Sequence, residues 1–116
     1  MDQNIISPDA RDKAPFEAPF EAIADPTRRH ILALLRHGER PAGDLVAALG
    51  VAQPSISKHL KVLREAGLVQ ARIDGPRRFY RLDPRPLAEL DAWLAPYRAF
   101  WAGKLDALGD HLNRSD

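Results

Sequence analysis

A short stretch of the sequence gathers side chains that can hydrogen-bond to bases and phosphates. It supplies one amide, two hydroxyls and two ammonium groups, from Gln53, Ser55, Ser57, Lys58 and Lys61. An amide can bind adenine through two hydrogen bonds, a hydroxyl can donate to a base edge or a phosphate, and an ammonium can neutralise a phosphate. The chemistry of this stretch points to a nucleic acid.

The same stretch fits a helix over about residues 53–66, because its apolar residues recur at helical spacing. Ile56, Leu60 and Leu63 stand at i, i+4 and i+7 and are expected to face the core. The opposite face then holds Pro54, Lys58, Lys61 and Glu65, with Ser55, Ser57 and Val62 at its flanks. For Lys61 and Arg64, a solvated helix flank is an equal alternative to a contact.

Two more helices are expected before this one. Asp25 can cap a helix that has Pro26 at its first position, and the apolar residues of 31–35 give that helix a buried face. A short helix over about 41–49 follows and ends at Gly50. Two short helices joined by a glycine-containing turn, the second with a polar and basic outer face, form a helix-turn-helix pattern.

A β-hairpin is expected directly after the helices. Polar and apolar residues alternate over 68–73, which predicts a half-buried strand, and a turn at 74–76 leads to a returning strand at 79–82. The apolar members of the alternation are Val69, Ala71 and Ile73. Arg77 and Arg78 stand side by side at the tip, where phosphate or minor-groove contact gives them a purpose. The alternative is a pair of solvated charges that protects an edge strand.

The end of the sequence carries a long apolar seam with steps of three and four residues. Its members are Leu87, Leu90, Leu94, Tyr97, Trp101, Leu105, Leu108 and Leu112, with Trp93 and Phe100 beside them. This spacing predicts an amphipathic helix of about 26 residues, kinked or broken near Ala95 because Pro96 removes one helical hydrogen bond. The seam is larger than a small winged helix can cover, so we expect a symmetric dimer. The expected interface residues are Phe20, Leu90, Leu94, Tyr97, Trp101, Leu105 and Leu108, with Phe16 as a further candidate.

Composition and charge agree with one small globular domain. The chain has 116 residues, of which 45% are hydrophobic and 28% charged. Its formal charge of +1 is unevenly distributed, since residues 26–82 carry eleven Lys and Arg against four Asp and Glu. Such a basic middle attracts a polyanion, although a solvated face without a partner is the plainer alternative.

The expected fold class is mainly α with a β-hairpin wing. A winged helix-turn-helix over residues 16–85 is followed by a long C-terminal dimerisation helix, residues 86–116, in the same domain. Residues 1–15, with prolines among polar residues, are expected to form a flexible arm.

Several classes of function are disfavoured by what the sequence lacks. It has no cysteine for a disulfide, a thiolate metal site or a nucleophile, and no GxGxxG, GxxxxGK[ST] or HExxH motif. We therefore expect no enzyme and no cofactor. No apolar run approaches the roughly 18 residues that span a bilayer. No basic segment followed by an apolar one opens the sequence, so we expect no secretory signal and a cytosolic location.

The sequence from Phe20 to Leu82 resembles the ArsR/SmtB family of bacterial winged-helix transcriptional repressors. The resemblance rests on three segments in the family's order and spacing, namely 20–29 with its Asp-Pro-Thr-Arg-Arg motif, 31–35 and 53–69. It implies a homodimer that binds an imperfect palindrome in operator DNA near a promoter and blocks transcription.

The resemblance also assigns roles in DNA binding. In the family, the positions that match Gln53, Ser55, Ser57 and Lys58 face the major groove, and the wing contacts the adjacent backbone or minor groove. The sequence departs from the family at Ala52, where Ser is common, and alanine is a poor cap for a helix start.

Metal sensing is disfavoured by comparison with the family. Members that bind thiophilic metals place Cys at the positions matching Pro41 and Gly43, and neither residue can bind a metal, which favours a metal-independent branch. A second family site uses Asp and His pairs on the last helix to bind zinc. Here that helix offers Asp106, Asp110 and His111, and the histidine is turned away from the shared face of the two aspartates.

The effector and one rival function stay open. The sequence leaves three forms of control open: an apolar small molecule between the last helices, a protein partner, or the protein's own abundance. A winged-helix module that binds a protein, an antirepressor with little direct DNA binding, is the alternative function. The basic residues Lys58, Lys61, Arg77 and Arg78 distinguish the two functions, because a module that binds only protein has no reason to keep them.

His59 is expected to pack at the edge of the buried face.

Overall fold

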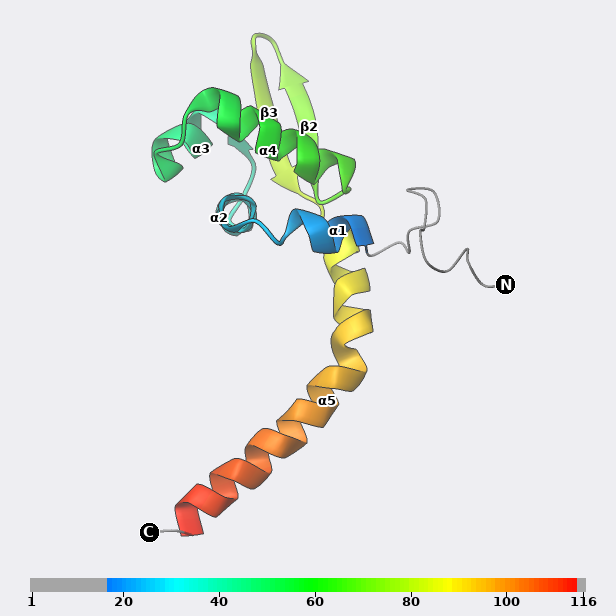
Figure 1. The fold of residues 1–116 in the computed structure, drawn as a ribbon. Coiled ribbons are helices and arrows are strands. Elements are labelled where there is room, and N and C mark those ends of the chain that lie inside the picture. Colours follow the sequence, from blue (N-terminus) through cyan, green and yellow to red (C-terminus); the bar gives the residue numbers. More distant parts are fainter. Residues whose placement is uncertain (1–16, 115–116) are drawn as a thin grey trace, which may run out of the picture.

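The computed structural model describes residues 17–114, with side chains described through residue 109. The described part consists of helices of 6 to 30 residues and a small sheet (Figure 1). The elements in chain order are α1 (Glu17–Ala22), α2 (Pro26–Leu35), β1 (Arg40–Pro41), α3 (Ala42–Leu49), α4 (Gln53–Glu65), β2 (Val69–Asp74), β3 (Arg77–Leu82) and α5 (Arg85–Arg114). The predicted arm, residues 1–15, and Phe16 lie outside the described residues. The predicted fold class, a winged helix-turn-helix with a long C-terminal helix, is confirmed.

Local sequence explains where the helices begin and end. The carboxylate of Asp25 accepts a hydrogen bond from the backbone N–H of Arg28 at 3.0 Å, and Pro26 occupies the first turn of α2, as predicted. The α3 helix ends at Gly50, whose φ of 66° is a left-handed conformation that glycine adopts without strain. At the start of α4, Ala52 caps nothing with its side chain.

The sheet has three antiparallel strands in the order β1-β3-β2. The hairpin of β2 and β3 pairs Val69 with Leu82 at its base and Asp74 with Arg77 at its tip, and Gly75 turns the chain with a φ of 62°. The two-residue strand β1 pairs with β3 and was not expected, because two residues show no periodicity.

The prediction that the strand over 68–73, which is β2, is half-buried is wrong beyond the first residue of β2. Val69 is buried, but Ala71 is exposed and Ile73 is 69% exposed. The reason is visible in Figure 1, where the outer part of the hairpin projects past the helices. The β2–β3 hairpin is called the wing below.

The core lies between the helix-turn-helix and the base of the wing. Ile56, Leu60 and Leu63 of α4 are at most 1% exposed, which confirms their predicted burial. Their neighbours in the cluster come from the other elements and include Ala22, Ile31, Leu35, Leu45, Leu68, Val69 and Tyr80. Because the apolar stripe of α4 is buried here, its polar stripes are directed outward.

The α5 helix begins in the core and then leaves it. Leu90 is 4% exposed, whereas every residue from Ala95 to Leu108 is exposed. Figure 1 shows the helix running away from the other elements and changing direction about midway, which agrees with the kink expected at Pro96. Arg98 reaches back to donate a hydrogen bond to the backbone carbonyl of Asp91 at 3.1 Å and also pairs with the Asp91 carboxylate.

Candidate nucleic-acid interface

The outward face of α4 has the residues that the sequence predicted. Gln53, Ser57, Lys58 and Lys61 are exposed, and Ser55 is half-buried. The helix holds them in a fixed order, since its opposite stripe is anchored in the core. Gln53 occupies the first turn, where side chains can extend from the end of the helix toward a partner.

The wing places its two adjacent arginines on opposite faces. Residues paired across an antiparallel hairpin share a face, and successive residues alternate. Arg77, opposite Asp74, therefore lies on the face that also carries Phe79 and Arg72. Arg78, opposite Ile73, lies on the face that carries Tyr80.

A chain of contacts braces the outer face of the wing. Arg72 donates two hydrogen bonds to the Glu39 carboxylate, at 2.6 and 3.2 Å, and this contact lowers the pKa of Glu39 and raises that of Arg72. The guanidiniums of Arg72 and Arg77 lie 4.7 and 5.0 Å from the centre of the Phe79 ring. This stacking holds the Arg77 guanidinium close to the sheet.

Two hollows separate α4 from the wing. The first, which we call the helix–wing groove, is lined by Ser57, Leu60, Lys61, Arg64, Glu65, Val69, Arg78 and Tyr80. The second, the tip hollow, lies at the start of α3 and is lined by Pro41, Ala42, Gly43, Asp44, Gln53, Pro76, Arg77 and Arg78. Arg78 borders both hollows.

The structure therefore brings together most of the predicted DNA-binding residues, but not all. Gln53 and Arg77 meet at the tip hollow, and Ser57, Lys61 and Arg78 meet at the helix–wing groove. Ser55 and Lys58 line neither hollow and belong to the part of α4 that is turned away from the wing.

The sequence left Arg64 open between a contact and a solvated flank, and the structure places it at the helix–wing groove. The brace formed by Glu39, Arg72 and Phe79 was not predicted. A signal for Arg64 existed, since Ser57, Lys61 and Arg64 are spaced at i, i+4 and i+7. No signal existed for the pairing of Glu39 with Arg72, which are 33 residues apart.

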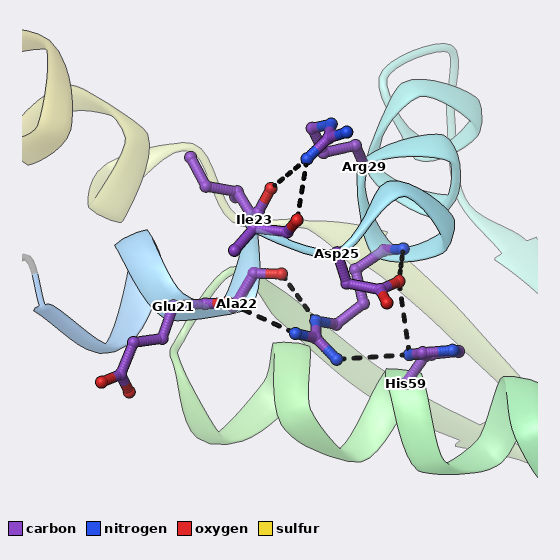
Figure 2. A network of polar contacts seen from close by, with 8 residues as sticks. Glu21, Ala22, Ile23, Asp25, Arg29 and His59 are labelled. Atoms are coloured by element: carbon purple, nitrogen blue, oxygen red, sulfur yellow. Dashed lines mark hydrogen bonds and ion pairs between the residues drawn. The ribbon is translucent and has the colours of Figure 1, made fainter.

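A polar network holds α4 and α1 together on the side away from the wing (Figure 2). The Arg28 guanidinium donates to the carbonyls of Ala22 at 2.6 Å and Glu21 at 3.3 Å, and its Nη1 lies 3.4 Å from Nδ1 of His59. Nδ1 of His59 also lies 3.8 Å from the Asp25 carboxylate. His59, expected at the edge of the buried face, is half-buried there and has polar neighbours.

A second arginine completes the attachment of α1. Arg29 donates to the carbonyls of Ile23 at 2.8 Å and Ala24 at 3.1 Å (Figure 2). The two adjacent arginines thus supply donors to the carbonyl groups of residues 21–24, at the end of α1 and just beyond it.

Aromatic side chains connect α1 to a largely exposed face of α5. The Phe20 ring meets Trp93 edge-on at 5.2 Å between centres, and Trp93 lies 4.9 Å from Tyr97. Farther along, Phe100 is 63% exposed and Leu105 is 61% exposed, with Trp101 and Leu108 also exposed. Of the predicted interface residues, Leu90 is buried within its own chain and Leu94 is half-buried.

Among the described side chains, no three His, Cys, Asp or Glu groups come together in a cluster that could hold a metal ion. Asp106 is described and exposed, whereas the side chains of Asp110 and His111 lie outside the described set. Within residues 17–114, no helix combines the length and the apolar character needed to cross a membrane.

Fold and site together define a winged helix-turn-helix protein whose α4 helix has a polar and basic outward face. A sequence model described as "Bacterial regulatory protein, arsR family" matches residues 25–71. The HTH-type transcriptional regulator Rv2034 of Mycobacterium tuberculosis is 42% identical over 95 residues, which cover 78% of this chain and 89% of that protein. The transcriptional repressor SdpR of Bacillus subtilis is 39% identical over 75 residues, covering 65% and 83%.

Solved structures agree with the sequence matches. An ArsR-like transcriptional regulator from Rhodococcus sp. RHA1 superimposes with a TM-score of 0.65 and 31% identity, over 81% of this chain and 89% of that one. The chain belongs to the arsR family of bacterial regulatory proteins. It is a DNA-binding transcriptional regulator and not an enzyme.

Proposed function

We propose that the protein is a homodimeric repressor that binds a palindromic operator through α4 and the wing of each subunit. The observation that carries the proposal is the exposed polar face of α4, with Gln53, Ser57 and Lys61 beside the two wing arginines. A surface of this kind suits DNA, because cations fix the position on the phosphates while an amide in the major groove distinguishes the bases.

The roles of individual residues follow from their chemistry. Gln53 is proposed to bind adenine through two hydrogen bonds, and Ser55 and Lys58 extend the contact on the side of α4 away from the wing. Arg77 is proposed to contact the neighbouring backbone or minor groove from the wing tip.

A second copy of the chain is the partner proposed for the exposed face of α5. That face is aromatic and aliphatic, and the same surface on two copies can meet about a two-fold axis. A two-fold pair presents two α4 helices to successive major grooves about 34 Å apart, and this arrangement requires a palindromic site. The repressor named among the relatives favours repression over activation.

The decisive experiment measures binding to a duplex from the upstream region of the protein's own gene by fluorescence anisotropy at several salt concentrations. We expect the logarithm of the affinity to fall linearly with the logarithm of the salt concentration, with a slope of about 0.9 for each phosphate contacted. Gln53→Ala should narrow the preference for this duplex over a scrambled duplex by roughly tenfold, because one bidentate base contact is lost. Affinity that is independent of salt would refute DNA binding and favour the antirepressor alternative.

A further inference from the structure

One flank of α4 carries a row of polar residues that faces the wing. Ser57, Lys61 and Arg64 are exposed and spaced at i, i+4 and i+7, so they lie along one edge of the helix. All three line the helix–wing groove. The row is distinct from Ser55, which lies on the opposite flank, and from Lys58, which lies between the two flanks on the outward face.

Arg78 closes the groove from the wing. Its place opposite Ile73 in the hairpin directs it to the same face as Tyr80, which lines the groove as well. Within the described part of the chain, no hydrogen bond, ion pair or ring contact engages its guanidinium. Arg77 differs on both counts, because it lies on the other face of the wing and stacks on Phe79.

The groove combines three cations and a hydroxyl above a buried apolar floor. The cations are Lys61, Arg64 and Arg78, and one carboxylate, Glu65, opposes them. The floor is formed by Leu60, Val69 and Tyr80, which are at most 6% exposed. The groove contains no Asn or Gln side chain that could pair with a base edge, whereas clustered cations beside a hydroxyl suit an anion.

We propose that the helix–wing groove is a seat for one stretch of the DNA backbone, in which Lys61, Arg64 and Arg78 bind phosphate oxygens together and Ser57 donates its hydroxyl to the same strand. The proposal rests on the proposed function and identifies the ligand of the groove as a phosphodiester of the DNA backbone. It gives neighbouring residues different contacts on the DNA. Arg78 acts with α4 on one strand, and Arg77 acts separately from the wing tip. Ser57 contacts the backbone, and the reading of bases is left to other residues of α4.

The test replaces phosphates of the operator by neutral methylphosphonates and measures binding of the full-length protein and its variants. Each replacement is made at one position and at its two-fold mate in the other half-site, because both subunits of the proposed dimer have the groove. At the seat positions, neutralisation should weaken wild-type binding about tenfold for each half-site, as the loss of a charge-assisted contact does. Lys61→Ala and Arg78→Ala should lose no further affinity on that modified duplex, although each loses affinity on the unmodified one. Arg77→Ala should weaken binding to both duplexes by the same factor.

The outcomes separate this inference from the proposed function. If wild type binds the unmodified duplex without salt dependence, DNA binding itself fails. If wild-type binding depends on salt but no modified position abolishes the loss of affinity caused by Lys61→Ala and by Arg78→Ala, the shared seat is refuted. The seat is also refuted if the same position abolishes the loss of affinity caused by Arg77→Ala, because Arg77 would then share the strand with Arg78.

Ser57 and Glu65 provide a second, independent readout. Ser57→Ala should weaken binding to operator and scrambled duplexes by equal factors, whereas Glu65→Gln should tighten binding to both, because it removes the one carboxylate in the groove. Arg36→Ala, an exposed cation that lines neither hollow, serves as the matched control for loss of charge. A change in base preference on Ser57→Ala would overturn the assignment of this groove to the backbone. Circular dichroism of each variant verifies that the fold is retained.

Discussion

At the scale of single residues, Asp83 joins the wing to α5. Its carboxylate accepts hydrogen bonds from the backbone N–H of Arg85 at 3.1 Å, from the Arg85 guanidinium at 2.6 and 2.9 Å, and from Gln70 of β2 at 2.8 Å. The side chain of Arg85 is the largest influence and, with these other donors, holds the pKa of Asp83 well below its usual range.

Asp83 should make the stability of the protein sensitive to acid. A carboxyl whose pKa is lowered by folding stabilises the native state above its unfolded pKa, about 3.9, and loses that contribution as the pH falls toward the folded value. Asp83→Asn should therefore lower the melting temperature at pH 6 and bring it closer to wild type at pH 3. Thermal unfolding at the two pH values measures this. An equal gap at both would show that the charge of Asp83 does not contribute.

Ala52 is a position where one hydroxyl should stabilise α4. Its backbone, with φ −59° and ψ 146°, is extended as a cap requires, but the methyl group accepts no hydrogen bond. Ala52→Ser should raise the free energy of unfolding by about 1 kcal/mol, measured by urea denaturation. Ala47→Ser, exposed inside α3, is the control and should give no gain, so equal stabilisation by both would argue against capping.

At the scale of elements, α1 is held in place through carbonyl groups at its end as well as through its buried residues. The Arg28 side chain bonds to two of these carbonyls and also contacts His59 of α4. Since α1 also carries Phe20, which packs on Trp93, this arginine links α4 to the beginning of the exposed face of α5.

Arg28→Ala should loosen α1 and cost about 1 kcal/mol of stability, because the part-buried carbonyl group of Ala22 loses its donor. In a Trp101→Phe background, Trp93 reports the change as a red shift of its fluorescence when Phe20 moves away. Amide exchange over residues 17–24 should accelerate as well. Arg36→Ala is the control cation; if it produced the same shift, the effect would come from net charge and not from the carbonyl contacts.

The sequence predicted elements better than it predicted how they contact each other. The spacing of Ile56, Leu60 and Leu63 identified α4 and its outward residues, because helical periodicity is a local property. The alternation in β2 could not show that Ile73 lies beyond the body of the protein. Contacts such as those of Arg28 with His59 and of Arg72 with Glu39 depend on how distant segments pack, so they became visible only in the fold.

The sequence predicted which residues belong to the candidate site but not how they are distributed between the helix–wing groove and the tip hollow. Gln53, Ser57, Lys61 and the two arginines were identified from their chemistry and from the family resemblance. The separation of Arg77 from Arg78 depends on the register of the hairpin, in which Asp74 pairs with Arg77. That register follows from a two-residue turn at residues 75–76, whereas the sequence predicted a turn over 74–76 and a returning strand only from Phe79.

At the scale of the whole molecule, the exposed face of α5 should decide the oligomeric state. Trp101→Lys combined with Leu108→Lys should yield monomers in sedimentation velocity, because two charges on each copy would have to be buried in an apolar contact. The control is Ala99→Lys with Asp106→Lys, which adds the same side chains on the opposite side of the helix and should leave a dimer. A dimer in both double variants would exclude this face from the interface.

The exposed outer part of α5 has a thermodynamic consequence. From Ala95 to Leu108 every side chain of the helix is exposed among the described residues, and one turn is weakened by proline. Helices of such length are marginal in water on their own. Ordering of this segment and pairing of two subunits should then be one coupled equilibrium governed by mass action. The cellular level of the protein would itself set the fraction of chains that are fully helical and competent to occupy an operator.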